Sequence, residues 1–409
     1  MTSSKVAAID VHKKVLMVVL VPPADAEGSI HERRRFATTT ADLSHLAAWL
    51  HDGGVSDVVM ESTAQYWRPV WQALEPHFRL HLAQAQSNKA PHGRKHDFGD
   101  AARLGRRFLA RELILSFVPE PAQRSWRKLT RGRVQLVRHR VRLQNQVEAL
   151  LEETGIKLSS VISDLFGQSG RRILHALAKG ETDPQVLAGL GDRRLHCPAE
   201  QLKQALSGHM SWEDQQLLAL WLEHVELLDR QIAKMEALTA AALGEHQDAV
   251  ARLTEVPGIS LHTALGIVAE VGASAATFPS AEALASWVGV CPGQNVSAGV
   301  SHGENSPKGN RHLRSLLVQA AQAAVKTKGS HLQLQFRRWV PRLGFLKAIW
   351  AIAHRLCRLA WKILHDGVRY VEHGQITDPR TKHHLAQKHL RALRQLGYQV
   401  SIAPQTGTA

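Results

Sequence analysis

The sequence has little cysteine and no long apolar run, and both scarcities exclude classes of protein. Its three cysteines, Cys197, Cys291 and Cys357, form no C-x-x-C pair, which excludes a disulfide framework and a zinc ribbon and favours a reducing compartment. The longest apolar run, VLMVVLV at 15–21, is far shorter than the ~20 residues of a membrane-spanning helix. Met1 leads into polar residues rather than a signal peptide, so we expect a cytoplasmic protein with no membrane partner.

Acidic residues are also scarce relative to basic ones. The chain has 36 Asp and Glu against 51 Lys and Arg, a formal charge of +15 and a pI near 10.1. A field of this sign attracts polyanions, so the composition favours nucleic acid as the partner. The 409 residues suffice for two or three domains, each with its own core.

The N-terminal region alternates between apolar and amphipathic segments. Runs rich in β-branched residues predict a hairpin in KVAAIDVHKKVLMVVLV and further strands in RRRFATT, SDVVMES and FRLHLAQ. Helices are expected in TADLSHLAAWLHD, with Thr40 or Asp42 near its N-cap, in QYWRPVWQALEPH, and over 98–112. This order predicts an α/β domain, a mixed sheet with helices on its faces.

The middle of the chain, about 120 to 245, has helical periodicity and no strand signal. Segments 125–154 and 211–243 predict two long helices, the first amphipathic and rich in arginine. They suit an antiparallel helical arm or a coiled-coil oligomerisation element. The alternative is a plain helical subdomain whose arginines face solvent. Region 248–370 is predicted to be mostly helical, and the tail 371–409 basic and partly disordered.

Two aspartates, Asp97 and Asp100, stand three residues apart at the start of a predicted helix. They share one face of that helix, so their charges repel and favour a cation nearby. Arg94, Lys95 and Arg103 are one possible source of positive charge. A divalent metal is the other, and it requires further carboxylates from elsewhere in the fold.

Such carboxylates occur on two predicted strands. Asp10 lies inside the first apolar strand, and Glu61 closes the strand VVME, where an acid is costly unless it serves a function. If both reach the edge near Asp97 and Asp100, two Mg²⁺ ions about 4 Å apart would neutralise the set and clamp a phosphodiester. The four acids therefore predict metal-dependent chemistry on nucleic acid.

The C-terminal half offers two phosphate-binding candidates. LTEVPGISLHTALGIVAEVG at 253–272 has the pattern of a helix-hairpin-helix, in which the N–H groups of Gly258 and Ile259 would hold a phosphate. A simple helix-turn-helix packing element is the alternative. The downstream loop, rich in Gly, Ser and Asn, ends in KGNRHLR, whose basic residues could bracket a second phosphate. These residues are Lys308, Arg311 and Arg314, and composition does not choose a nucleophile among Cys291, Ser297, Ser301 and Ser306.

The N-terminal motifs resemble a known family. AAIDVHKK, VVMESTAQYWRPVW and KHDFGDAARLGR are similar to the RuvC-like, RNase H-fold domain of the DEDD transposases of insertion-sequence family one-ten. The resemblance implies that the four acids bind Mg²⁺, or Mn²⁺, as catalytic groups. The family commonly has Gly where this chain has Ala64 or Gln65, and Thr where it has His96, which affects fine geometry but removes no carboxylate.

The C-terminal motifs resemble the same family. GVCPGQNVSAG and KGNRHLRSLLVQAA are similar to its C-terminal transposase domain, and the resemblance assigns the nucleophile to Ser297. Members of the family are bridge-RNA-guided serine recombinases whose two halves are thought to meet between protomers. The resemblance therefore implies donor and target DNA, a structured bridge RNA and a homo-oligomer, dimer or tetramer, as partners.

We thus expect four regions: a catalytic domain at 1–115, a helical oligomerisation arm at 120–245, a transposase domain with the serine at 248–370, and the tail. The expected function is site-specific DNA recombination through a covalent phosphoserine, in a cytoplasm where the protein associates with the nucleoid. Two alternatives remain: a RuvC-like junction or guided nuclease that uses water, and a non-catalytic nucleic-acid-binding protein.

Overall fold

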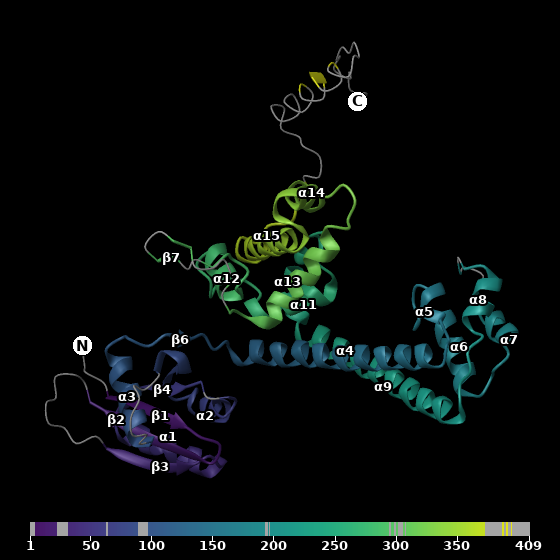
Figure 1. The fold of residues 1–409 in the computed structure, drawn as a ribbon. Coiled ribbons are helices and arrows are strands. Elements are labelled where there is room, and N and C mark those ends of the chain that lie inside the picture. The colour runs from purple at the N-terminus through teal and green to yellow at the C-terminus, as the bar shows by residue number, and fades with distance from the viewer. Residues whose placement is uncertain are drawn as a thin grey trace. The chain divides into compact units, whose positions relative to one another are not determined.

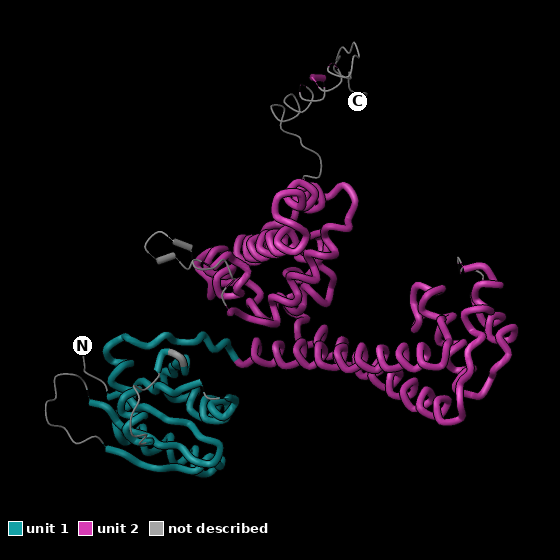
Figure 2. The backbone as a smooth tube through the Cα atoms, in the orientation of Figure 1, with its two compact units in different colours: residues 1–120 teal, residues 121–409 magenta. Residues whose placement is uncertain are grey.

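The computed structural model divides into two compact units, residues 1–120 and 121–409 (Figure 2). It describes residues 5–22, 32–62, 64–88, 97–192, 195, 197–293, 296–297, 300–301, 306, 308–372, 387, 390–391 and 394. The predicted disorder of the tail concerns residues that lie almost entirely outside these ranges.

Unit 1 contains a six-stranded mixed sheet in the order β3-β2-β1-β4-β5-β6. The strands are β1 Lys5–Val11, β2 Val15–Val21, β3 Arg33–Ala37, β4 Val55–Glu61, β5 Arg79–Ala83 and β6 Leu115–Ser116. The β1–β4 and β4–β5 pairs are parallel, and the other three pairs are antiparallel. The predicted mixed sheet and its order of elements are confirmed, and they are consistent with an RNase H-like fold. The short elements β6 and η1 (Ala85–Asn88) were not predicted, because such short segments carry no periodicity.

Both faces of this sheet are covered by helices, as the uninterrupted apolar runs of β1 and β2 require. Helices α1 (Thr40–Asp52) and α2 (Trp67–Leu74) pack on the face that contains Ala7, Ile9 and Met60. Helix α3 (Asp97–Leu109) covers the opposite face, which contains Ala8 and Val59. Since side chains alternate along a strand, residue parity decides which helix each strand residue meets.

Helix boundaries in unit 1 follow local hydrogen bonding. The N-cap of α1 is Thr39, whose hydroxyl accepts from the N–H of Asp42, so the prediction that Thr40 or Asp42 lies near the N-cap is confirmed. Helix α3 ends at Leu109 rather than at the predicted residue 112, since Arg111 adopts a positive φ of 58°. Helix α3 also lies unusually close to β1 and β2: a Cβ on Gly105 would stand 2.5 Å from Val21 Cγ2.

Unit 2 is helical and contains the two long helices predicted, α4 (Pro121–Glu153) and α9 (Trp212–Ala242), which lie side by side (Figure 1). The ion pairs Arg133–Glu236 and Arg140–Asp229 show that they run antiparallel, because one residue number rises as the other falls. Asp229 also pairs with Arg171, and although burial acts to raise its pKa, the two arginines hold it below its ordinary value. Several arginines of α4 thus pair inward instead of facing solvent. Coiled-coil character stays a prediction.

The remaining elements of unit 2 form two apolar cores. One core surrounds the C-terminal end of α4 and the N-terminal end of α9. The other is formed by the helices that follow α9. Among the described helices, none has the length and hydropathy to cross a membrane. The elements are α5 Leu158–Val161, α6 Gln168–Ala178, α7 Pro184–Gly189, α8 Ala199–Ala205, η2 Gly244–His246, α10 Gln247–Thr254, α11 Leu261–Val271, α12 Ala281–Val288, β7 Val296–Ser297, β8 Val300–Ser301, α13 Arg311–Ala324, α14 His331–Leu343 and α15 Phe345–His365.

Candidate active site

The two strand acids lie side by side on the face covered by α3. Ile9 of β1 is the parallel partner of Met60 of β4, so Asp10 and Glu61 are each one residue beyond that pair. Asp10 has the parity of Ala8, and Glu61 has the parity of Val59, and both of those residues face α3. The register therefore brings the two carboxylates to one end of the sheet, on one face.

Helix α3 brings the other two acids to the same place. Asp97 and Asp100 occupy its first turn. The pKa of Asp10 is raised, first by burial and then by the charges of Glu61, Asp100 and Asp97, while His12 acts to lower it. Each of the other three predicted acids therefore lies within electrostatic range of Asp10.

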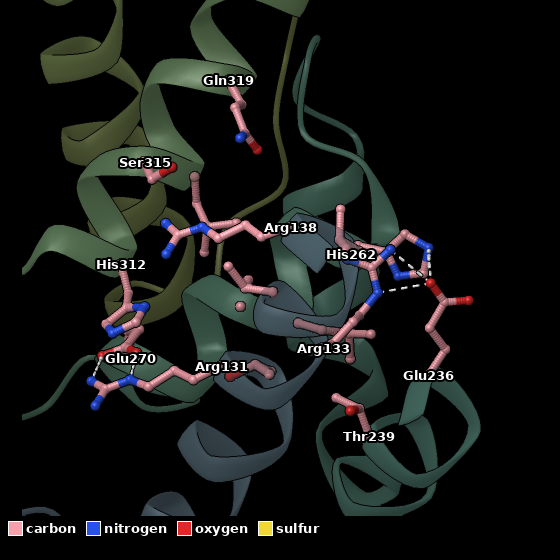
Figure 3. Close-up of a pocket in the computed structure, with 16 residues that line it drawn as sticks. Arg131, Arg133, Arg138, Glu236, Thr239, His262, Glu270, His312, Ser315 and Gln319 are labelled. Atoms are coloured by element: carbon pink, nitrogen blue, oxygen red, sulfur yellow. Dashed lines mark hydrogen bonds and ion pairs between the residues drawn. The ribbon is translucent and has the colours of Figure 1, made fainter. Parts of the chain in front are cut away.

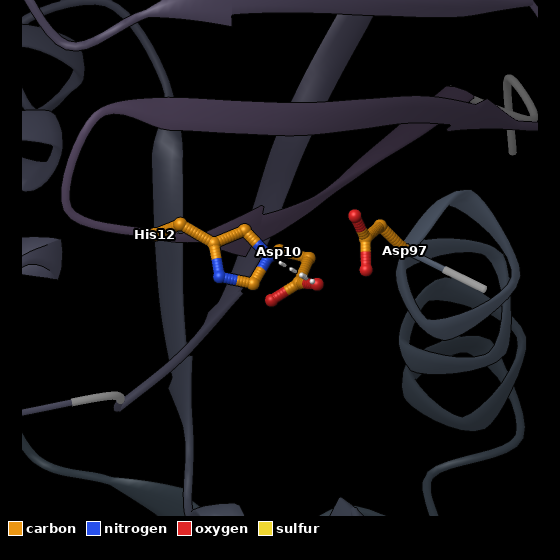
Figure 4. A group of neighbouring side chains, drawn as sticks. All are labelled: Asp10, His12 and Asp97. Carbon is orange, nitrogen blue, oxygen red and sulfur yellow. Dashed lines mark hydrogen bonds and ion pairs between the residues drawn. The ribbon is translucent and has the colours of Figure 1, made fainter. Parts of the chain in front are cut away.

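A histidine joins this cluster. Ligand atoms of Asp10, His12 and Asp97 lie within 4.8 Å of one another, and His12 Nε2 is 3.1 Å from Asp10 Oδ2 (Figure 4). Sequence reasoning missed His12, although an acid and a histidine two residues apart at the end of a strand share one face. Among the described residues, this trio forms the group whose donor atoms best suit a shared cation.

Polar residues around the acids fix two of the carboxylates. Asn88, at the end of the short helix η1 (Ala85–Asn88), donates from Nδ2 to Glu61 Oε2 at 2.9 Å. Arg103 Nη1 pairs with Asp100 Oδ1 at 2.8 Å. Neutralisation by arginine is thus confirmed for Asp100, whereas Arg94 and Lys95 lie outside the described residues.

These residues fit a divalent cation. Carboxylate and amide oxygens are the donors that Mg²⁺ and Mn²⁺ prefer. The Oδ1 atom of Asn88 is buried and has no hydrogen-bond partner. Burial, and after it the charges of the neighbouring acids, raise the pKa of Asp10, and a bound cation would offset both effects. Arg103 pairs with Asp100, and the buried Asn88 oxygen is a further donor that a cation could use.

The loop with the candidate nucleophiles lies between α12 and α13. The backbone of Ser297 pairs with Val300 in the small β7–β8 hairpin, and the side chains of Ser297 and Ser301 lie outside the description. The hydroxyl of Ser306 accepts a hydrogen bond from Trp350 Nε1 at 2.9 Å. The hydroxyl of Ser306 therefore has a structural partner in Trp350.

The three basic residues predicted to bracket a phosphate surround the start of α13. Lys308 and Arg311 are exposed, and the guanidinium of Arg314 lies 5.1 Å from the centre of the Trp350 ring. The N-cap Asn310 lies among them. A helix N-terminus beside these cations favours an anion.

The turn at Gly258 and Ile259 is closely packed. The N–H of Ile259 donates to Val256 O at 3.0 Å, and a Cβ on Gly258 would stand 2.3 Å from Ala320 O of α13. The positive φ of Gly258, 87°, and this close approach explain the glycine. The phosphate-binding role of the pair stays a prediction, and it requires that the Ile259 N–H leave Val256 O.

Comparison with known proteins gives two family matches. Residues 7–156 match a model described as a transposase, of the DEDD type of IS110, and residues 250–337 match one described as the transposase IS116/IS110/IS902 family. Together they cover more than half of the chain. The first match includes the four acids, and the second includes Ser297.

Three relatives agree with these matches. A probable family 20 transposase of Pseudomonas aeruginosa is 26% identical over 320 residues, which are 75% of this chain and 83% of the relative. A transposase for insertion sequence element IS1111A of Coxiella burnetii is 25% identical over 89% of this chain and 90% of its own length. An uncharacterised 43.6 kDa protein of insertion element IS110 from Streptomyces coelicolor is 29% identical over 29% of each chain.

Proposed function

Since this chain belongs to the IS110 family of DEDD transposases and is a DNA transposase, we propose that it recombines DNA through a covalent phosphoserine, with divalent cations held by its acids. The observation that carries this proposal is the convergence of Asp10, Glu61, Asp97 and Asp100 at one end of the sheet in unit 1. Four carboxylates held close together repel one another and the phosphates of nucleic acid, which disfavours a protein that only binds nucleic acid.

In the proposed site the four acids bind Mg²⁺ or Mn²⁺, and His12 completes the set on the side of Asp10. When bound, such ions stabilise negative charge on the attacking and leaving oxygens of a phosphodiester. Asn88 orients the Glu61 carboxylate, and Arg103 orients that of Asp100. These partners hold the two carboxylates in place before any cation arrives.

Ser297 is the proposed nucleophile. Its hydroxyl oxygen attacks the phosphorus, the bond from phosphorus to the 3′ oxygen breaks, and the proton lost by the serine is balanced by the one gained by the 3′-hydroxyl. The 5′ end of the DNA is then joined to the protein, and reversal of the step rejoins DNA without ATP. Lys308, Arg311 and Arg314, with the N–H groups of Gly258 and Ile259, are proposed as phosphate contacts. A nuclease that uses water would leave no covalent adduct.

We expect the purified protein alone to bind DNA with little sequence preference and to require a structured RNA for site choice. Sequence-independent phosphate contacts dominate in a chain of charge +15. Family membership supplies the proposed guide, a bridge RNA that pairs with donor and target. RNase-treated protein is assayed for recombination with the transcript flanking its gene and with a shuffled RNA of equal length. Site-specific recombination without RNA would contradict the guide, although not the chemistry.

The proposed homo-oligomer is supported by an apolar stripe on α9. Its members are exposed by 42% at Leu217, 61% at Leu220, 42% at Leu227 and 47% at Leu238. Together with His224, Gln231 and Lys234 they repeat in alternating steps of four and three residues, the spacing of a coiled-coil seam. The opposite side of α9 is buried against the rest of unit 2. This seam is the proposed contact between copies of the chain.

A double substitution tests the seam. Leu220→Lys with Leu227→Lys should convert the oligomer to monomer in sedimentation experiments, because charges at both sites would repel across the contact. Ala233→Lys with Ala237→Lys adds the same charge at exposed positions away from the seam and should leave the oligomer intact. An unchanged sedimentation coefficient in the leucine double variant would show that the copies meet elsewhere.

A further inference from the structure

A buried carboxylate lies in the otherwise apolar helix α11. Glu270 is 1% exposed, and an unpaired charge at such a position would strongly destabilise the fold. Arg131 of α4 donates from Nε and Nη2 to its two oxygens at 2.7 and 2.8 Å, and Nε of Arg127 lies 3.4 Å from Oε2. Burial acts to raise the pKa of Glu270, but Arg131, Arg127 and a hydrogen bond from Asn310 outweigh it and hold the pKa below its ordinary value.

The hydrogen bond from Asn310 connects this ion pair to the loop that contains Ser297. Asn310 Nδ2 donates to Glu270 Oε2 at 2.7 Å, and its Oδ1 accepts from the N–H groups of His312 and Leu313 at 3.0 and 3.1 Å. One end of the amide thus binds α11, and the other caps α13. The side chain is fixed at both ends.

The two ends of the loop meet at this point. The N–H of Asn310 donates to Trp287 O at 3.2 Å. A Cβ on Gly309 would stand 2.2 Å from Val288 O, so only glycine allows the two ends of the loop to come so close. The guanidinium of Arg127 lies 5.8 Å from the centre of the Trp287 ring. Residues of α4 and α11 therefore hold both ends of the segment between α12 and α13.

We infer that Arg127, Arg131, Glu270 and Asn310 form a loop clamp in which Glu270 is a positioning residue for the reaction. By anchoring Asn310, Glu270 fixes the base of the Ser297 loop and the neighbouring Lys308 and Arg311 against the long helix α4. The inference rests on the proposed role of Ser297. It adds that the reactive loop takes its position from the helical arm rather than from its own short hairpin.

A cavity of about 140 Å³ borders the clamp, between α4, α9, α11 and α13. Figure 3 shows Arg131 bound to Glu270 below His312, with Arg138, Ser315 and Gln319 further along the cavity. If Glu270 loses its charge, the Arg131 side chain can move into this cavity, where polar side chains such as Ser315 and Gln319 can solvate it. We therefore expect Glu270→Gln to fold.

Glu236 provides a matched control. It accepts from Arg133 of the same helix α4 at 2.7 Å and lines the same cavity, but its partners are Arg133 and His262 rather than the loop. We expect Glu270→Gln to reduce the single-turnover rate of covalent adduct formation, measured at saturating DNA, by about 100-fold, the cost of a small misplacement of reacting groups. Glu236→Gln should leave that rate unchanged even where it lowers the melting temperature equally.

A second variant keeps the buried ion pair intact. Asn310→Ser retains a capping oxygen for α13 but loses the donor to Glu270, and it should slow adduct formation as Glu270→Gln does. Both variants should speed hydrogen exchange of the amides of His312 and Leu313, whereas Glu236→Gln should not. Equal exchange and equal adduct rates in all three variants would overturn the clamp. A wild-type protein that forms no adduct, with exchange still faster in the two clamp variants, would instead overturn the role of Ser297.

Discussion

Asp100→Asn and Asp10→Asn are each expected to reduce strand transfer by about 1,000-fold or more in Mg²⁺, a loss at least as large as that of one catalytic charge partner in other enzymes. Each change replaces a negatively charged carboxylate of the proposed cation site by a neutral amide. The measurement is recombination of a supercoiled donor and target pair under saturating RNA. Wild-type rates for Asp100→Asn would refute the metal role of this cluster.

Asp10→Asn should also leave the metal-free protein at least as stable as the wild type. The pKa of Asp10 is raised by burial and by the neighbouring acids, so its charged form is unfavourable in the fold at neutral pH, and asparagine removes that cost. Mg²⁺ should therefore raise the melting temperature of the wild type but not that of Asp10→Asn.

Asp57 on β4 is the control for that stability effect. Burial acts to raise its pKa, but Ser56, His81 and Arg79 outweigh it and lower the pKa. The sign is thus opposite to that at Asp10: the ionised Asp57 stabilises the fold above its ordinary pKa, and this contribution is lost as the pH falls through the lowered value. Asp57→Asn should lower the melting temperature and leave its response to Mg²⁺ unchanged.

Ser297→Ala should abolish the covalent protein–DNA adduct, a decrease of about 10,000-fold or more, and keep nucleic-acid affinity. Phosphate affinity comes from cationic side chains and contributes equally in both proteins. The adduct is measured by denaturing electrophoresis with labelled DNA. Ser306→Ala is the control, since that hydroxyl accepts from Trp350 and its loss should leave the adduct intact. An adduct mapped to Ser301 or Ser306 in the Ser297→Ala protein would move the nucleophile.

Most of the acidic cluster could be predicted from the sequence because its two strand acids interrupt apolar runs. Burying a carboxylate such as Asp10 or Glu61 in an apolar strand costs free energy. An acid at such a position therefore indicates a function, whichever strands pair. The register between β1 and β4 could not be predicted, because it depends on packing between segments about fifty residues apart. Asn88 was missed for a related reason: it lies in a short connection with no periodic pattern.

The loop clamp could be predicted from the sequence only in part. Glu270 stands out as one charge in the apolar segment LHTALGIVAEV, which predicts a buried partner, but nothing local indicates that the partner is Arg131, 139 residues earlier. The choice of Ser297 came from family resemblance alone, since the loop contains several similar nucleophiles. The chain divides into two units after Glu120, and the four predicted regions with their roles stay predictions.

Residue parity along β1 and β4 has a consequence for how this family can diverge. A single inserted or deleted residue within β1 before Asp10 would turn the carboxylate from α3 toward the core formed by α1 and α2, exchanging it with an apolar neighbour. The damage would be twofold, a lost ligand and a buried charge. Length changes should therefore accumulate in the connections between strands, while the strands themselves evolve by substitution only.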